Sequence, residues 1–542
     1  MEEDISMKSI GLMVILAVSI FLSACDLIWP PPVLVTSITI IEEGGKVIVE
    51  LGETLQMIAQ IRPVNATDKR VTWSVENAGA VSARETRAHI TQKGVLTGLV
   101  AGTVIVKATA QDGSAVEGTM VITVSEEEIF FPDPVLRQAV RDAEGYTGNP
   151  TGPIYKNEVL GITELVYWGS SPARESDSWN HISEWHKEKL VSDYYGERKL
   201  EESRHHEHTH NHVPRAKISN LEGIQHLTSL KVLTFGNNQV SDISPVQNLV
   251  NLDWLWFNDN QVSDISPVQN LVNLKSLAFN GNQVSDITLV QNLLKLVFLD
   301  FQGNQVSDIT SVQNLVNLKW LAFNGNQVSD ITPVQNLMNL QLLSFWNIQV
   351  SDITPVQNLV NLEWLDFGNN QVSDITPVQN LVNLEILDFG NNQVSDITPV
   401  QNLVNLEWLS FYDNQVSDIS PLQNLVNLKS LRFGNIQVSD ITPVQNLVNL
   451  EMLRFNDNQV SDITPLQNMA NLYILTFVNN QVSDLTPLVL NTGSFEPPSW
   501  WSEWAGIDMR HNNLVLTQGT QNRNDINTLI GRGVNVVYEP QN

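Results

Sequence analysis

The chain has 542 residues, with 59 acidic and 30 basic side chains and a formal net charge of −29. A chain of this length exceeds one ordinary core, so we expect two or more domains. The acidic surface repels phosphate groups and therefore disfavours nucleic acid as a partner; it also favours solubility, and we expect a monomer. The single cysteine excludes an intramolecular disulfide and a cysteine-based zinc site.

The amino terminus predicts a signal peptide. Residues 10–24 form an apolar run that is too short to span a bilayer comfortably, and Lys8 precedes it. Residues 1–6 are acidic, so we predict Met7 as the true start and residues 1–24 as the signal peptide. The run ends in LSAC at residues 22–25, which resembles the lipobox of bacterial lipoproteins. The resemblance implies cleavage before Cys25, acylation of its sulfur and anchoring to the cell membrane. The alternative is a plain signal peptide with an incidental cysteine.

After a proline-rich tether at residues 25–33, residues 34–124 predict an antiparallel β-sandwich. Six short runs alternate apolar and polar residues, with turn residues between them: VTSITII, KVIVEL, TLQMIAQI, RVTWSV, TVIVKATA and TMVITV. The motifs GETL at 52–55, VTWS at 71–74 and GVLTG at 94–98 resemble the group 2 bacterial Ig-like domain. The resemblance implies a spacer or an adhesion module at a bacterial surface. We expect Trp73 to lie in the core between the two sheets.

Residues 225–490 repeat with a fixed period of 22 residues, as in LEWLDFGNNQVSDITPVQNLVN at 362–383. The first, fourth and sixth positions are expected to point inward, and the sixth is Phe in all twelve regular units. The ninth position is Asn in ten units and is expected to bind backbone groups. Ile348 and Ile436 interrupt this ladder, and we expect Asn347 and Asn435 to substitute in part.

The template resembles the leucine-rich repeat of the internalin type of bacterial surface proteins. The resemblance implies a mainly β fold: a right-handed solenoid with parallel strands on one side and 3-10 or short helices on the convex side. Thr354 and its equivalents are expected to cap these helices, with Gln357 three residues on. The Asp that recurs once per unit could form a calcium ladder, but its place before the cap favours turn stabilisation.

Both ends of the array depart from the template, because terminal repeats must cover the core. Residues 125–161 are expected to form a linker and a helical cap, with Asp133 as N-cap and Pro134 as the first helical residue. A first repeat at 162–224 is interrupted by a His-rich insertion at about 169–215. Residues 491–542 are expected to form an irregular repeat and a closing strand near 534–538.

The concave face is the predicted binding surface. The third, fifth and seventh positions of each strand project from it, and here the otherwise copied repeats differ most. Six of the 14 Trp residues stand at these positions, and acidic and basic side chains lie in successive units. The alternative is that the aromatics only pack on one another. The candidate ligand-binding residues are Trp254, Trp256, Phe298, Trp320, Trp346, Trp364, Asp366, Asp388, Trp408, Tyr412, Arg432 and Arg454.

The insertion contains a histidine run that could bind zinc, since neutral imidazole is a good ligand for that ion. The run is His205, His206, His208, His210 and His212. A polar loop of this kind more commonly binds metal adventitiously, so we expect no resident cofactor.

The sequence contains no motif of a hydrolase or nucleotide-binding enzyme, and we predict a non-enzyme. The predicted function is that of an extracytoplasmic, lipid-anchored adhesion or binding protein with a protein or glycan ligand. The alternative is a metal-binding surface lipoprotein that acts through the histidine run.

Overall fold

The computed structural model describes residues 31–79, 86–169, 216–497 and 504–541. The chain divides into two compact units, one of residues 1–129 and 151–158 and the other of residues 130–150 and 159–542. Within the described residues, no helix is both long and apolar enough to cross a membrane.

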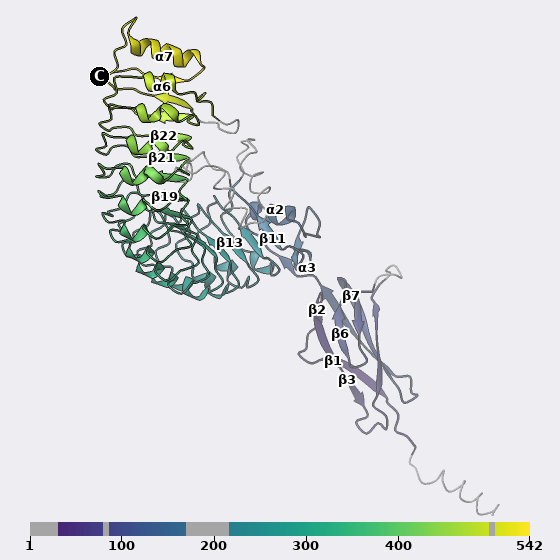
Figure 1. The fold of residues 1–542 in the computed structure, drawn as a ribbon. Coiled ribbons are helices and arrows are strands. Elements are labelled where there is room, and N and C mark those ends of the chain that lie inside the picture. Colours follow the sequence, from purple (N-terminus) through teal and green to yellow (C-terminus); the bar gives the residue numbers. More distant parts are fainter. Residues whose placement is uncertain (1–30, 80–85, 170–215, 498–503, 542) are drawn as a thin grey trace, which may run out of the picture. The chain divides into compact units, whose positions relative to one another are not determined.

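The first unit contains two four-stranded sheets with strand orders β1-β3-β6-β5 and β2-β8-β7-β4 (Figure 1). Their inward side chains form one core that includes Trp73, Leu96 and Val106, which confirms the predicted sandwich and the place of Trp73. A short ribbon of β9 and β10 and the helix α3 follow. The elements are β1 (Ser37–Glu42), β2 (Ile48–Glu50), β3 (Thr54–Arg62), β4 (Val71–Asn77), β5 (Ala88–Ile90), β6 (Val95–Gly98), β7 (Gly102–Ala110), β8 (Glu117–Ser125), β9 (Glu128–Ile129), β10 (Ile154–Tyr155) and α3 (Lys156–Val159).

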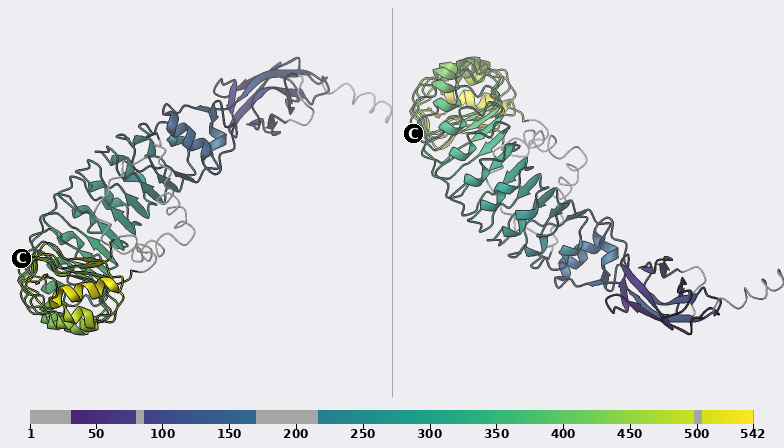
Figure 2. Two further views of the ribbon diagram at one scale, coloured as in Figure 1. Left: turned by 90° about the horizontal axis from the view of Figure 1, so that it is seen from above. Right: turned by 90° about the horizontal axis from the view of Figure 1, so that it is seen from below.

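The second unit is built on one 15-stranded parallel sheet, β11 to β25 in chain order. Residues 22 apart pair across neighbouring strands of the regular units, as Asp366 does with Asp388, so each repeat position forms a row along the solenoid. Figures 1 and 2 show these strands stacked side by side. The strands are β11 (Glu164–Val166), β12 (Val232–Thr234), β13 (Trp254–Trp256), β14 (Ser276–Ala278), β15 (Phe298–Asp300), β16 (Trp320–Ala322), β17 (Leu342–Ser344), β18 (Trp364–Asp366), β19 (Ile386–Asp388), β20 (Trp408–Ser410), β21 (Ser430–Arg432), β22 (Met452–Arg454), β23 (Ile474–Thr476), β24 (Gly506–Asp508) and β25 (Val536–Val537).

Short 3-10 helices form the other side of the solenoid, as expected. Their caps differ from the expectation for Thr354. The helix η7 begins at Thr354, and Asp352 Oδ1 accepts the hydrogen bond of the Thr354 amide at 2.8 Å. The recurring Asp therefore stabilises the turn, because it reaches the amide two residues on. The helices are η1 (Ile224–His226), η2 (Ser244–Val246), η3 (Ser266–Asn270), η4 (Thr288–Asn292), η5 (Thr310–Val312), η6 (Thr332–Val334), η7 (Thr354–Val356), η8 (Thr376–Val378), η9 (Thr398–Val400), η10 (Ser420–Asn424), η11 (Thr442–Asn446) and η12 (Thr464–Asn468).

A continuous stack of phenylalanine rings fills the core between the sheet and these helices. The twelve rings from Phe235 to Phe477 are buried, and neighbouring centroids lie 5.6–5.9 Å apart. Strands of a sheet lie about 4.8 Å apart. Because the rings are more widely spaced than the strands, the solenoid curves with its sheet on the concave side.

The ladder of asparagines at the ninth position is confirmed. Asn260 is typical: its amide nitrogen donates to the carbonyls of Phe235 and Phe257, each at 3.0 Å, and its oxygen accepts from the Val240 amide at 2.9 Å. Each such side chain therefore ties two successive repeats together and satisfies backbone groups that the strand leaves unpaired.

The expected substitution by Asn347 and Asn435 is wrong. Both residues have a positive φ, 55° and 52°, and occupy the left-handed turn position that other repeats also fill with Asn, Asp or Gly. Asn347 bonds to the side chain of Asn369. In the described part of the chain, no side chain accepts from the amide of Val328, the group that an asparagine at position 348 would bind.

Helical caps close both ends of the second unit. Asp133 accepts from the amides of Val135 and Leu136 at the start of α2 (Pro134–Asp142), which confirms the predicted N-cap. Its other oxygen accepts from the amide of Ser219 at 2.7 Å, which joins the cap to the first convex return. At the far end, α6 (Thr486–Leu490) and α7 (Gln521–Gly531) accompany the closing strands. The closing strand and a short helix on the convex side of the last regular repeat, which is α6, were predicted from the sequence, whereas α7 was not.

Candidate functional site

The concave face carries the predicted aromatic side chains, but several of them are buried. Trp320 and Trp364 each expose 5% of their surface, and Phe298 exposes 8%. Trp254, Trp256, Trp346, Trp408 and Tyr412 are half-buried. These side chains therefore project less freely from the concave face than we expected, because neighbouring rings cover one another.

These rings form a continuous series across β13 to β18. Trp254 stacks on Trp256 with centroids 5.9 Å apart, and Trp256 lies 5.9 Å from Phe298. Phe298 lies 5.0 Å from Trp320, which meets Trp364 edge-on at 6.4 Å. Such packing holds each ring in one orientation, so the half-buried members form a preorganised surface.

Next to the aromatic series, a hydrogen-bonded network of polar side chains crosses the fifth and seventh positions. The amide of Trp346 donates to Asn324 Oδ1 at 2.7 Å, which fixes the orientation of the Asn324 side chain. Asn324 Nδ2 then donates to Gln302 Oε1 at 2.8 Å, and Gln302 Nε2 donates to Asp300 at 3.0 Å. The backbone amide of Trp346, two residues after the end of β17, thus determines the direction of every bond in this part of the network.

Asp300 is the buried end of the network and exposes only 2% of its surface. Burial raises its pKa to about 6, although Gln302 and Asn280 both donate to its carboxyl group. A carboxylate with so little exposure requires these donors to remain charged near neutral pH. The concave-face candidates did not include Asp300, although they included Phe298 of the same strand.

At the other end of the network, Asp366 and Asp388 lie side by side on β18 and β19. Burial and, after it, the neighbouring charge of Asp388 together raise the pKa of Asp366 to about 7. The hydroxyl of Ser344 lies 2.9 Å from Asn324 Oδ1 and 3.1 Å from Asp366 Oδ2. Since a hydroxyl has one hydrogen, a protonated Asp366 that donates to Ser344 satisfies both contacts.

Two aromatic side chains flank this carboxyl pair. A side chain at Gly368 would clash with Trp346, and one at Gly390 would clash with Tyr412. Both rings therefore lie against the backbone of the two repeats that carry the aspartates. The guanidinium of Arg432 lies 3.8 Å from the centroid of the Tyr412 ring, which places a cation at the edge of the cluster.

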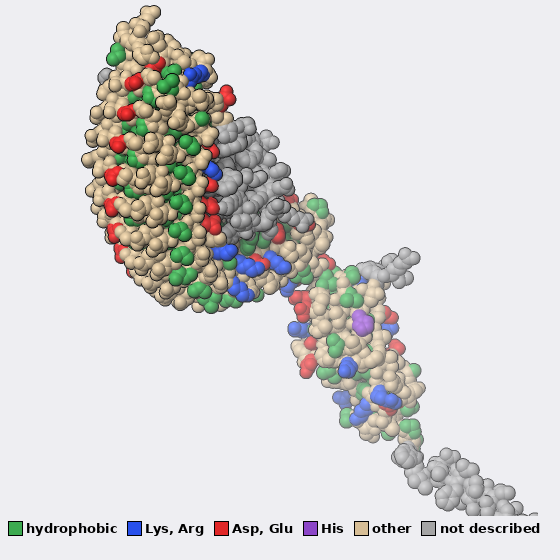
Figure 3. Space-filling model, in the orientation of Figure 1, with side chains coloured by type: hydrophobic (Ala, Val, Ile, Leu, Met, Phe, Trp, Pro, Cys, Tyr) green, Lys and Arg blue, Asp and Glu red, His purple; other side chains and the backbone are tan. Residues whose placement is uncertain are grey.

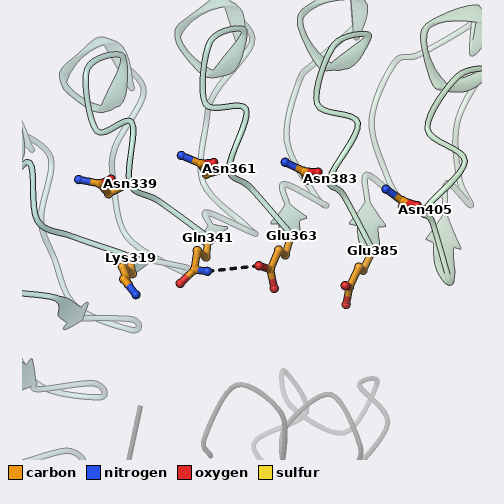
Figure 4. A pocket seen from close by; sticks show the side chains of 8 residues that line it. All are labelled: Lys319, Asn339, Gln341, Asn361, Glu363, Asn383, Glu385 and Asn405. Atoms are coloured by element: carbon orange, nitrogen blue, oxygen red, sulfur yellow. Dashed lines mark hydrogen bonds between the residues drawn. The ribbon is translucent and has the colours of Figure 1, made fainter. Parts of the chain in front are cut away.

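A groove runs along the edge of the sheet, where each chain segment enters its strand (Figure 4). Its volume is about 300 Å³, and four asparagines line one wall and Lys319, Gln341, Glu363 and Glu385 the other. Gln341 Nε2 donates to Glu363 at 3.2 Å. The asparagines are Asn339, Asn361, Asn383 and Asn405.

The structure brings most of the predicted ligand-binding residues to one face. The aromatics share the face with the Asp366–Asp388 pair, and Arg432 and Arg454 follow on β21 and β22, so the charges are sorted along the sheet as expected. Sequence reasoning missed Asn324 and Ser344, whose roles depend on contacts between residues about 20 apart. Cys25 and the five histidines of the run lie outside the described residues. Among the residues described, no group of three or more His, Cys, Asp or Glu side chains could hold a metal ion.

A curved parallel sheet with 22-residue units, preceded by a β-sandwich, defines a leucine-rich-repeat solenoid with an Ig-like domain. The sequence model of the bacterial Ig-like domain (group 2) matches residues 34–120. The model of leucine-rich repeats in two copies matches residues 250–293, 360–402, 404–446 and 448–489.

Among solved structures, an internalin (inlF) from Listeria monocytogenes is 31% identical, with a TM-score of 0.56, over 68% of this chain and 96% of that one. The chain belongs to the internalin-like leucine-rich-repeat proteins. A leucine-rich-repeat protein of Leptospira interrogans shares the fold at 21% identity and a TM-score of 0.52, over 59% of this chain and 81% of that one. The functional domain of InlJ from Listeria monocytogenes, which includes a cysteine ladder, shares the fold at 16% identity and a TM-score of 0.51, over 72% of this chain and 77% of that one.

Curated relatives match only a small part of the chain. The tail tube protein pb6 of Escherichia phage T5 is 37% identical over 94 residues, 17% of this chain and 18% of that protein. A 3-O-alpha-D-galactosyl-alpha-L-arabinofuranosidase of Bifidobacterium longum is 34% identical over 97 residues, 17% of this chain and 8% of the enzyme. The chain spans less than a fifth of the length of these relatives. Ig-like and leucine-rich-repeat domains are typically binding modules and occur in extracellular or surface proteins.

Proposed function

We propose that this protein is a cell-surface binding protein whose concave face binds a protein partner. The observation that carries the proposal is the concentration of sequence variation on that face. The repeats are nearly copies elsewhere, yet the third, fifth and seventh positions change from unit to unit. A recurring scaffold with one variable face suits the recognition of a particular partner.

The contact surface is the set of half-buried side chains, and the buried rings support it. Trp346 and Tyr412, on either side of the Asp366–Asp388 pair, combine large apolar area with polar edges and lie in fixed positions, as do the side chains that dominate binding energy at protein interfaces. Arg432 and Arg454 beyond them give the surface two signs of charge, which orients a partner.

Site-specific photo-crosslinking tests this proposal. A photoreactive amino acid replaces Trp408 on the concave face, and in a control chain it replaces Gln401, which is exposed on the convex side of the same solenoid. With host-cell or neighbouring-cell surface extracts, we expect an adduct from position 408 alone. The double substitution W346A/Y412A should reduce the yield at least about tenfold, as expected for the loss of two aromatic contacts. Equal adducts from both positions would contradict concave-face binding, and a carbohydrate adduct would indicate a glycan ligand instead.

We also propose that the protein is anchored through lipid on Cys25 and that the Ig-like domain acts as a spacer. The four-residue context of Cys25 supports this. Growth with labelled palmitate should label the protein, and Cys25→Ser should abolish the label and release the protein from the membrane fraction. Persistent labelling of the variant would overturn the anchor.

A further inference from the structure

One flank of the solenoid carries a continuous row of exposed aliphatic side chains. In ten consecutive repeats, from Val250 to Val448, the residue after the 3-10 helix is aliphatic and 44–55% exposed. Figure 3 shows hydrophobic side chains, in green, that follow one another in a line along the solenoid. We call it the aliphatic row. Monomeric proteins rarely expose a contiguous apolar surface of such length.

The aliphatic row is held rigidly in place. Each aliphatic residue lies in a turn closed by a backbone hydrogen bond, such as that from the Leu362 amide to the Leu359 carbonyl at 3.0 Å. Its carbonyl also accepts from an asparagine of the next repeat, as Val360 does from Asn383 Nδ2 at 2.8 Å. Because these turns are already fixed, packing a second molecule against them costs little conformational entropy.

The surroundings of the aliphatic row favour a second copy of this chain as the occupant. On the helix side, the exposed neighbours are the Gln and Asn of the repeated QNLVN motif, so this strip is uncharged apart from Lys295 although the whole chain carries −29. The ten half-exposed side chains offer on the order of 600 Å² of aliphatic surface, approaching the about 800 Å² that each partner buries in a standard interface.

On the sheet side, the aliphatic row is bordered by the second position of each repeat, and its charges have opposite signs at opposite ends. We call these residues the charged row; they are Lys231, Asp253, Lys275, Val297, Lys319, Gln341, Glu363, Glu385, Glu407, Lys429 and Glu451. A two-fold axis at Gln341 would place Lys319 of one copy opposite Glu363 of the other, and Lys275 opposite Glu407. Figure 3 shows the corresponding change from blue to red side chains beside the aliphatic row.

The exceptions to this gradient obey the same symmetry. Asp253 lies within the basic half and Lys429 within the acidic half, and the same axis places them opposite each other. The same axis pairs Lys231 with Glu451. In the remaining pair, Val297 of one copy lies opposite Glu385 of the other. No two like charges meet. Two ion pairs that join described residues of this row, Lys275–Asp253 and Lys429–Glu407, are partly exposed, so each contributes little to the stability of the single chain.

We propose that two copies of this chain pack flank to flank through the aliphatic row, antiparallel, about a two-fold axis at Met338 and Gln341. If this axis lies along the radius of the solenoid's curve, the two curved solenoids lie one over the other. The contact can then extend along the whole aliphatic row. Such a contact is isologous and closes at the dimer. Both concave faces stay open, so the dimer does not depend on the function proposed above.

Sedimentation equilibrium of the full chain tests the dimer. We expect dimerisation within the micromolar range. The substitutions V360D, V382D and V404D should raise its dissociation constant at least about tenfold, because they place charges in the apolar contact. The matched control S351D, S373D and S395D adds the same charge to exposed positions of the same repeats and should leave it unchanged. A wild-type chain that stays monomeric at about 100 μM would overturn the proposal.

Cysteine crosslinking tests the position of the axis. In a C25S background, M338C should form an intermolecular disulfide under mild oxidation, because Met338 faces its own copy at the axis. V426C should not, since Val426 would face Val250 instead. A charge exchange gives an independent test: K319E or E363K alone should weaken the dimer and the double variant should restore it. Crosslinking of V426C in place of M338C, or no restoration by the double variant, would exclude this antiparallel arrangement.

Discussion

Asp366 is held among uncharged groups and beside a second carboxyl group, and both features favour its protonated form. Its pKa in the folded chain is about 7, above the value of 3.8 for an unperturbed aspartate. Well below pH 4 the group is neutral in the folded and the unfolded chain. Between pH 4 and pH 7 it ionises first in the unfolded chain, so the fold loses stability as the pH rises through this window.

We therefore expect Asp366→Asn to stabilise the solenoid at pH 8 by on the order of 1–2 kcal/mol and to have little effect at pH 4. The asparagine keeps a polar partner for Ser344 but carries no charge beside Asp388. Urea unfolding followed by circular dichroism at the two pH values measures this difference. A variant that is less stable than the parent at pH 8 would show that Asp366 is charged and satisfied in the folded chain.

The aspartates of the convex turns have the opposite dependence. Hydrogen bonds from the side chain and backbone of Thr376 lower the pKa of Asp374. Its stabilising effect is therefore present above pH 4 and is lost as the pH falls below that value. We expect Asp374→Ala to cost about 1 kcal/mol at pH 7 and less at pH 3, in the same unfolding assay. An equal cost at both pH values would mean that its charge is unimportant.

At the scale of the repeat, the asparagine ladder explains which element is weakest. The repeats with Ile348 and Ile436 lack the side chain that joins successive strand ends, although Ile348 is itself buried. Restoring the ladder with Ile348→Asn should give the Val328 amide a partner and add a second donor to the carbonyl of Phe323, which already accepts from Asn326 Nδ2 at 2.9 Å. We expect the hydrogen bonds to raise the free energy of unfolding by about 1 kcal/mol. The loss of the buried apolar surface of the isoleucine offsets part of this increase.

Chemical unfolding of I348N and of N370A measures how much one ladder asparagine contributes to stability, since the first variant adds such a residue and the second removes one. The N370A change removes an intact rung, in which Asn370 accepts from the Val350 amide and donates to the Phe345 carbonyl. It should destabilise the fold by about 2 kcal/mol, because buried backbone groups lose their partners. If I348N also lowers the free energy of unfolding, the packing of Ile348 stabilises the fold more than the hydrogen bonds of an asparagine would.

The repeating elements were predictable because each position recurs in many units. The twelve phenylalanines and the ladder asparagines reveal themselves by repetition, and Asp133 by its place directly before Pro134. The burial of Trp320 and Trp364 was not predictable, since it depends on rings from adjacent strands covering one another. The network from Asp300 to Asp366 also depends on contacts between repeats, and α7 lacks a strong apolar periodicity.

At the scale of the whole solenoid, each regular repeat packs mainly on its two neighbours, so the array should tolerate the loss of one unit. Deletion of residues 362–383 joins two compatible repeats. We expect a folded chain with an unchanged type of circular dichroism spectrum and a shorter arc in small-angle scattering. The deletion removes Asp366 and Glu363, so it should also disturb the candidate binding surface and the symmetry of the charged row. Unfolding of the shortened chain would mean that the repeats are not interchangeable.

The stacked phenylalanines also determine how large a partner can contact the whole concave face. Neighbouring ring planes are inclined by 11–17°, so each repeat acts as a thin wedge. With strands about 4.8 Å apart, wedges of this angle describe an inner radius on the order of 20 Å. A folded domain of 100 residues has a radius of gyration of about 13 Å. The curvature thus suits a single small domain or a slender segment, and a broad globular partner would meet only the rims of the arc.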